Sequence, residues 1–194
     1  MDAHPDYSIC FHACEVYDVR TQHLYYEAHK TPQGIKSGGA DVSSDMFLRR
    51  QFGTQPLTML MRVSMYDLSW FDIYHGYRDT HEVYLLLRKG KGYFMDFVGG
   101  VYIKHNGGIS TSVTIDRSKD DARLCYTELY LVNRQDKVLR DKLVDVLLWN
   151  YDIYKMERKR NEFHRVMCGY WTRTPHVALN VYRKIIIRNI KSLV

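Results

Sequence analysis

The sequence predicts an α/β fold, with strands in the first part of the chain and helices in the second. Tyr7, Ile9 and Phe11 alternate with other residues, which is the period of a strand that buries one face. The segment 93–103, YFMDFVGGVYI, gathers the aromatic and β-branched residues that favour strands. From residue 118 onward, apolar residues recur at the three- and four-residue spacing of amphipathic helices. We therefore expect a mixed sheet with flanking helices, followed by a C-terminal helical tail.

Shorter elements are expected between these segments. Residues 14–26 continue the first strand as a strand or hairpin, and residues 27–39 form a polar loop that contains several glycines. Residues 41–44, DVSS, offer capping residues for a short helix that continues to Arg50. Residues 58–63, TMLMRV, are an apolar run typical of a buried strand.

Helical patterns account for much of the remaining chain. Asp79 begins a short helix, because an acid in the first turn precedes an apolar run that ends at Gly90. Residues 118–135 and 136–160 each carry an apolar stripe at helical spacing. Pro175 suits the first position of a last helix. In that helix an apolar set opposes a basic set: Leu179, Val181, Tyr182, Ile185, Ile186 and Ile190 against Arg183, Lys184, Arg188 and Lys191. Such a helix either packs on the preceding helices or lies on an anionic membrane.

Composition narrows the classes of protein to be considered. The 194 residues are 45% hydrophobic and 26% charged, values that exclude bulk disorder. The formal charge of +6 allows an anionic partner, which can be a nucleotide, a membrane surface or a nucleic acid. Four cysteines show no paired metal-binding spacing and are expected to be reduced thiols. The sequence contains neither an apolar run of about 18 residues nor a signal peptide, so a cytoplasmic location is expected.

The segment 77–110 contains the densest set of chemically informative residues. The Gly99-Gly100 pair suggests a bulge within the predicted strand. Gly107 and Gly108 follow His105 and allow the backbone to approach a ligand closely. With Asp79 at a helix start and His105 at a strand end, we expect the two side chains to face one cleft.

The same segment resembles the inverting glycosyltransferases of family 2, which have the GT-A fold. The shared residues are Asp79, Leu86, Gly90-Lys91, Phe94-Met95-Asp96, Val98, Tyr102, His105 and Gly107-Gly108-Ile109-Ser110. Residues 5–12, PDYSICFH, and 58–62, TMLMR, also look like family segments. The resemblance therefore covers residues 1–112 and implies the C-terminal, acceptor-side part of a GT-A domain, with a helical extension over residues 113–194.

The resemblance implies roles for particular residues. Asp79 occupies the position of the catalytic base that takes the proton from the acceptor hydroxyl. His105 lies where the family places a histidine beside the diphosphate, and is a candidate ligand of its metal. The other candidate substrate-binding residues are Arg62, Trp70, Gly107, Gly108 and Ser110.

Two of these candidates have equally plausible structural roles. Arg62 either reaches an anion or is ion-paired at the edge of the sheet. Trp70 belongs to an aromatic cluster that suits sugar faces, but a linker packed on the core has the same composition. That cluster contains Tyr66, Trp70, Phe71, Tyr74, His75 and Tyr77.

The chain departs from the family pattern in two respects. Arg78 stands where many members have an acid, and the sequence has no D-x-D motif. The resemblance thus implies a chain that begins after the nucleotide-sugar half, with a divalent metal, Mn²⁺ or Mg²⁺, expected only together with that half. The complete protein is expected to transfer a hexose from a nucleotide sugar to a glycan or lipid-linked glycan acceptor in surface polysaccharide synthesis, at the inner face of the membrane.

Two other classes of function stay open from the sequence. One is a degenerate, non-catalytic transferase that binds a glycan or a protein. The other is a basic nucleic-acid-binding module, suggested by the net charge, the 16 tyrosines and the run KMERKR at 155–160. No recognised RNA- or DNA-binding motif accompanies that run, so a nucleic-acid partner is not expected.

Overall fold

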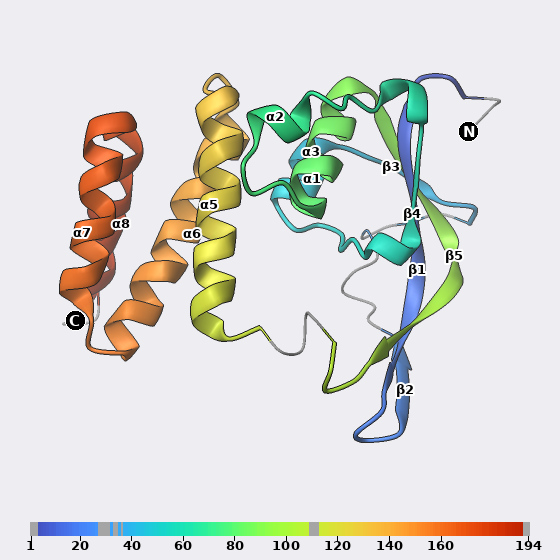
Figure 1. Ribbon diagram of the computed structural model, residues 1–194, viewed down its shortest axis with the longest axis horizontal. Helices are drawn as coiled ribbons and strands as arrows, with labels where there is room; N and C mark the ends of the chain where they lie inside the picture. The colour runs from blue at the N-terminus through green and yellow to red at the C-terminus, as the bar shows by residue number, and fades with distance from the viewer. Residues whose placement is uncertain (1–3, 27–31, 33–34, 36, 109–112, 192–194) are drawn as a thin grey trace. The chain divides into compact units, whose positions relative to one another are not determined.

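The computed structural model describes residues 4–26, 32, 35, 37–108 and 113–191 (Figure 1). The chain divides into two compact units, Met1–Val113 and Thr114–Val194. The first unit contains a mixed sheet with flanking helices, and the second consists of helices. The predicted α/β fold class is thereby confirmed.

Within the described residues of the first unit, five strands form one sheet around β1 (Tyr7–Asp18). β5 (Lys91–Lys104) pairs with β1 in parallel along its whole length. On the other side of β1, β4 (Met59–Met61) pairs antiparallel with the first half and β2 (His23–Tyr26) with the second. β3 (Ala40–Val42) pairs antiparallel with the beginning of β5. The β1–β5 register shifts on either side of Val98, so the bulge expected at the Gly99-Gly100 pair is present.

Short helices and one longer helix connect these strands. They are α1 (Ser44–Leu48), the 3₁₀ turns η2 (Pro56–Thr58) and η3 (Val63–Met65), α2 (Trp70–Ile73) and α3 (Asp79–Lys89). Helix α3 packs on β1 and β5, where its Leu86 is fully buried together with Ile9 and Phe11 of β1. The chain then passes through Gly90 directly into β5, so the helix and strand predicted for this segment are confirmed.

Two expectations for the first unit need correction. The apolar run 58–63 gives only the three-residue strand β4, which pairs with β1; none of its residues is buried, and Leu60 is exposed. The strand β3 was not expected, since Asp41 and Val42 read as the approach to a helix. Ser43 does cap α1, as predicted, by accepting a hydrogen bond from the Met46 amide.

The second unit contains α5 (Ile115–Val132), α6 (Lys137–Met156), α7 (Arg160–Arg173) and α8 (Pro175–Lys191). Helix α6 packs against the other three. Thr114 and Asp136 cap the starts of α5 and α6 by accepting backbone hydrogen bonds. Helices near α5, α6 and α8 were predicted, whereas α7 was not.

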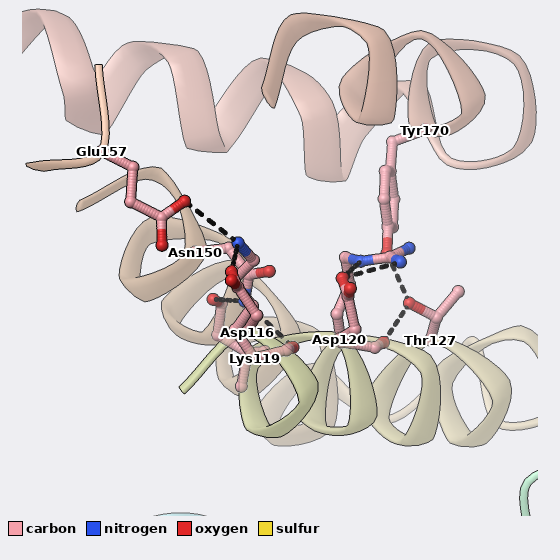
Figure 2. Close-up of polar contacts among 9 residues, drawn as sticks. Asp116, Lys119, Asp120, Thr127, Asn150, Glu157 and Tyr170 are labelled. Carbon is pink, nitrogen blue, oxygen red and sulfur yellow. Dashed lines mark hydrogen bonds and ion pairs between the residues drawn. The ribbon is translucent and has the colours of Figure 1, made fainter. Parts of the chain in front are cut away.

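A buried lysine joins α5 to the end of α6 (Figure 2). The amine of Lys119 pairs with Asp116, lies 3.6 Å from Oε2 of Glu157 and sits 4.0 Å from the ring centroid of Tyr154. Burial works to lower the pKa of Lys119, but the hydrogen bond with Asp116 and the surrounding negative charges raise it overall. Lys119 therefore stays charged inside the unit, and its partners offset the cost of its burial.

Candidate functional site

The first turn of α3 carries the residue with the strongest predicted role. Arg78 precedes the helix in an extended conformation and makes no side-chain cap. The acids Asp79 and Glu82 both lie in the first turn, where the helix dipole favours negative charge. The Asp79 side chain is exposed to solvent. An exposed carboxylate in this position can accept a proton from a hydroxyl group that approaches from solvent.

Glu82 differs from Asp79 because it is half-buried and hydrogen-bonded. Burial raises the pKa of the Glu82 carboxyl, the hydrogen bond from Tyr66 acts in the opposite direction, and the nearby charge of Asp79 adds to the rise. The hydroxyl oxygens of Tyr66 and Tyr77 are 3.2 Å apart. Because the single hydroxyl proton of Tyr66 goes to Glu82, Tyr77 must donate to Tyr66. Burial, and then this donation, raise the pKa of Tyr77. Glu82 is thus held by a chain of two tyrosines, while Asp79 faces solvent.

Aromatic side chains from η3, α2 and α3 pack beside this turn. Phe71 lies 4.6 Å from Tyr77 between ring centroids, and about half of its surface is exposed. His81 is fully buried between Tyr74 and Tyr77. Burial and the charge of Arg78 lower the pKa of His81 to about 4, so its imidazole is neutral at neutral pH.

In the structure, Arg62 and Trp70 hold parts of the fold together. The Arg62 guanidinium donates to the backbone carbonyls of Tyr7 and His4, each at 2.9 Å, and so fastens the start of β1 to β4. Trp70 is buried, with its ring against Tyr66 and under the Lys89 amine at 4.7 Å. A buried ring cannot stack on a sugar. Phe71, the next residue, offers the exposed aromatic surface that was expected of Trp70.

His105 and the glycines lie at the other end of the first unit. His105 is exposed just beyond β5, and its carbonyl accepts a hydrogen bond of 3.1 Å from the Gly108 amide. Gly107 lies within this turn, and Ser110 lies outside the described residues.

The expected cleft between Asp79 and His105 is not formed. Figure 1 shows α3 beside the beginning of β5, whereas His105 follows its far end. A 14-residue strand spans about 45 Å and an 11-residue helix about 16 Å, so the two residues are separated by on the order of 20–30 Å.

A hollow lies on the face of the sheet that α3 does not cover. It has a volume of about 370 Å³ and is lined by His4, Tyr7, Cys10, Tyr93 and Met95. Tyr7 donates a hydrogen bond of 2.5 Å to Asp41, which raises the pKa of Tyr7 to about 12. Burial raises the pKa of the Cys10 thiol. Both groups are therefore protonated at neutral pH, and neither is prepared to act as a base or nucleophile.

Among the described residues, no group of three His, Cys, Asp or Glu side chains is arranged to hold a metal ion. His105 therefore belongs to no such group among the described residues. A diphosphate-bound Mn²⁺ or Mg²⁺ needs several oxygen ligands, usually carboxylates. The residues that the structure describes do not fit such a site.

No protein-family model, curated protein or solved structure matches this chain. The described helices include none with the length and apolar character needed to cross a bilayer.

Reasoning from the sequence did not single out Glu82 as part of the candidate site. It lies three residues after Asp79, the spacing that places two side chains on one face of a helix. The link to Tyr66 depends on the fold of residues 63–77, and no local pattern indicates it.

Proposed function

We propose that residues 1–112 form the acceptor-side part of an inverting glycosyltransferase of family 2, with Asp79 as its catalytic base. The observation that carries this proposal is the exposed Asp79 carboxylate in the first turn of α3, a helix that passes through Gly90 straight into β5. This helix and strand hold most of the residues on which the family resemblance rests.

The chemistry assigned to Asp79 is a single proton transfer. Its carboxylate accepts the proton of an acceptor hydroxyl as that oxygen forms a bond to the anomeric carbon of the donor sugar. The bond to the nucleoside diphosphate breaks, and its electron pair leaves with the diphosphate. Glu82 is a poorer candidate for the base, because Tyr66 occupies it and burial limits its access to a substrate.

The acceptor sugar would rest on the aromatic residues beside the helix start. Phe71 exposes about half of its surface, and its ring packs against that of Tyr77. Aromatic faces suit the C–H-rich faces of pyranose rings. Phe71 thus takes the binding role for which Trp70 is too deeply buried.

The donor side is not provided by the residues described. The sequence has no D-x-D motif, and the described residues include no metal-ligand cluster. The proposal therefore assigns the nucleotide sugar and its divalent metal to a segment other than these residues. It also places the complete enzyme at the cytoplasmic face of a membrane, where a lipid-linked glycan acceptor would be extended.

The test is a transfer assay on the longest natural form of the polypeptide that carries these residues. Release of nucleoside diphosphate from a panel of nucleotide hexoses is measured with an oligosaccharide acceptor. Asp79→Asn should lower turnover by about 10²- to 10⁴-fold with donor binding retained, because the amide cannot accept the proton.

Asp45→Asn is the matched control. Asp45 is likewise exposed in the first turn of a helix, α1, but lies outside the proposed site, so its variant should retain full turnover. A folded Asp79→Asn protein with turnover within about threefold of the parent contradicts the assignment, because a lost general base costs far more.

A further inference from the structure

Helix α8 has two apolar faces, of which the packing of the second unit buries only one. Val177, Ala178, Val181 and Ile185 are buried. The sequence had grouped Val181 and Ile185 with Leu179, Ile186 and Ile190 on a single face, and the structure separates them. Leu179, Ile186 and Ile190 are 60%, 57% and 57% exposed. Their spacing of seven and then four residues places them on one outward stripe.

A stack of rings makes this stripe continuous with α7. Tyr182 of α8 lies between His164 and Trp171 of α7, with ring centroids 5.8 Å and 5.9 Å apart and nearly parallel planes. Nδ1 of His164 and the Tyr182 hydroxyl are 2.8 Å apart, within hydrogen-bond distance. Trp171 keeps almost half of its surface exposed. Ile186 follows Tyr182 by one helical turn, and Arg160 precedes His164 by one turn.

The turn between α6 and α7 adds a cationic pocket at the end of the unit where α8 ends (Figure 1). Lys155, Arg158, Arg160 and Asn161 line a hollow of about 230 Å³. None of the described residues forms an ion pair with these three cations; the nearby Glu157 pairs with Lys119 and Lys159. Met156, within the same turn, is 71% exposed.

The charge of this region is mainly positive. Between residues 155 and 191 there are ten Lys and Arg but only two Glu, and α8 contains no acid. Lys184 and Arg188 of α8 pair with Asp145 and Asp152 of α6. Arg183 and Lys191 have no such partner among the described residues.

We propose that this surface docks on an anionic lipid bilayer. The docking face comprises Leu179, Tyr182, Ile186 and Ile190 of α8, Trp171 of α7, and the cationic pocket with Met156. The apolar side chains enter the boundary between headgroups and acyl chains, Trp171 lies at the interface, and the pocket holds lipid phosphate. This inference does not depend on glycosyl transfer.

The combination of groups favours a bilayer over the other anionic partners. Nucleic acid would use the cations and rings but would leave Leu179, Ile186, Ile190 and Met156 in water. A second copy of the chain would bury the isoleucines, yet two copies of this face would bring like charges together. An anionic bilayer accepts both kinds of side chain.

The experiment is co-sedimentation of the full chain with two kinds of vesicle, phosphatidylcholine alone and phosphatidylcholine mixed with phosphatidylglycerol. We expect binding to the anionic vesicles, weaker at high salt, and little binding to the neutral ones. Arg158→Ala with Arg160→Ala should lower the partition coefficient by on the order of tenfold, since each cation near the surface contributes several-fold. Ile186→Ser with Ile190→Ser should lower it at least as much.

Matched controls lie elsewhere on the same unit. Val132→Ser on α5 and Lys137→Ala on α6 change an exposed apolar and an exposed basic residue outside the docking face, so both should bind like the parent. Circular dichroism confirms that each variant keeps its helices. A blue shift of Trp171 emission on adding anionic vesicles, absent in Trp171→Phe, locates the contact.

Four results would overturn the proposal. One is the absence of binding to anionic vesicles. Another is binding that survives the double isoleucine variant, because the α8 stripe would then not make the contact. The third is a protein that does not bind lipid but forms a dimer, which the double isoleucine variant dissociates. The face would then be a contact between copies of the chain. Tighter binding to single-stranded DNA than to vesicles would likewise assign the cations to nucleic acid.

Discussion

The imidazole of His81 lies fully buried between Tyr74 and Tyr77, in contact with no solvent. Its pKa in the folded protein is about 4, against 6.5 for the free side chain. Below pH 6.5 His81 therefore binds a proton in the unfolded chain but stays neutral in the folded protein. The contribution of neutral His81 to the free energy of unfolding is fully present above pH 6.5. It falls by about 3 kcal/mol as the pH drops to 4.

We predict that His81→Phe flattens this dependence, because phenylalanine keeps an aromatic ring but does not titrate. The free energy of unfolding is measured by urea denaturation between pH 4 and 6.5. His105→Gln, which removes an exposed histidine, is measured as the control. Asp18, whose pKa is lowered by its hydrogen bond with Arg20, loses its contribution only at more acidic pH. An unchanged slope in His81→Phe would assign the acid sensitivity to other groups.

Lys119 and Arg123 allow a comparison between a buried and a part-exposed ion pair on one helix. Each pairs with an aspartate three residues earlier, but the Lys119 side chain is 4% exposed and that of Arg123 is 20% exposed. Lys119→Ala removes the cation that Asp116, Glu157 and the Tyr154 ring surround, and should cost about 3 kcal/mol. Arg123→Ala should cost less than about 1 kcal/mol. Thermal and urea unfolding of the two variants test the order, and equal losses would contradict it.

At the scale of elements, the sequence predicted those whose pattern is local. Helix α3 has an acid at its start and glycine after its end, and β5 is rich in aromatic and β-branched residues, so both were found. Strand β3 has only three residues and exists because it pairs with Gly92, Tyr93 and Phe94 of β5. A pairing between segments some fifty residues apart leaves no mark in either segment alone.

Helix α7, and the face of α8 that is buried, were harder to predict from the sequence for another reason. In α7 only Phe163, Met167 and Tyr170 are buried, and most of the remaining positions are polar, so its apolar period is short. In α8 isoleucines occur on both faces, and the side that packs is decided by α6 and α7. Apolar residues indicate that a face can be buried, but the partner elements determine which face is buried.

The candidate site was predictable in part. Asp79 at a helix start follows from local sequence, and its exposure is seen in the structure. The burial of Trp70 rather than Phe71 depends on how the four-residue helix α2 lies, which two adjacent aromatic residues do not reveal. The expectation of one cleft for Asp79 and His105 ignored the length of β5, which carries His105 away from α3.

The pairing of β3 with β5 gives a prediction at this scale. Gly39 has a φ of +135°, and a Cβ there would lie 2.4 Å from the Phe94 carbonyl oxygen. Gly39→Ala should therefore destabilise the first unit by about 3 kcal/mol or more, since backbone strain and a clash add together. Gly38→Ala is the matched control, because Gly38 has a φ of +96° but open space around it, so only strain of about 1–2 kcal/mol applies. Chemical denaturation should show the larger loss for Gly39→Ala.

At the scale of the whole molecule, the two units differ in net charge. Residues 1–113 contain 11 Lys and Arg and 12 Asp and Glu, whereas residues 114–194 contain 17 and 10. The net positive charge thus belongs to the helical unit, which also carries the proposed docking face. The unit with Asp79 is nearly neutral, so an anionic surface attracts the chain chiefly through its helices.

The helical unit should fold by itself. Its core is formed by side chains of its own helices, among them Leu139, Leu143 and Leu147 of α6, Phe163 and Met167 of α7, and Val177 and Val181 of α8, all buried. A polypeptide of residues 114–194 should therefore show helical circular dichroism and a cooperative thermal transition. Residues 114–174 are the control, because removing α8 exposes the side chains of α6 and α7 on which Val177 and Val181 pack. That shorter piece should lose cooperativity, since much of the apolar surface that stabilises the unit would face water. If residues 114–194 alone lack a cooperative transition while the full chain has one, the helices depend on the first unit for their stability.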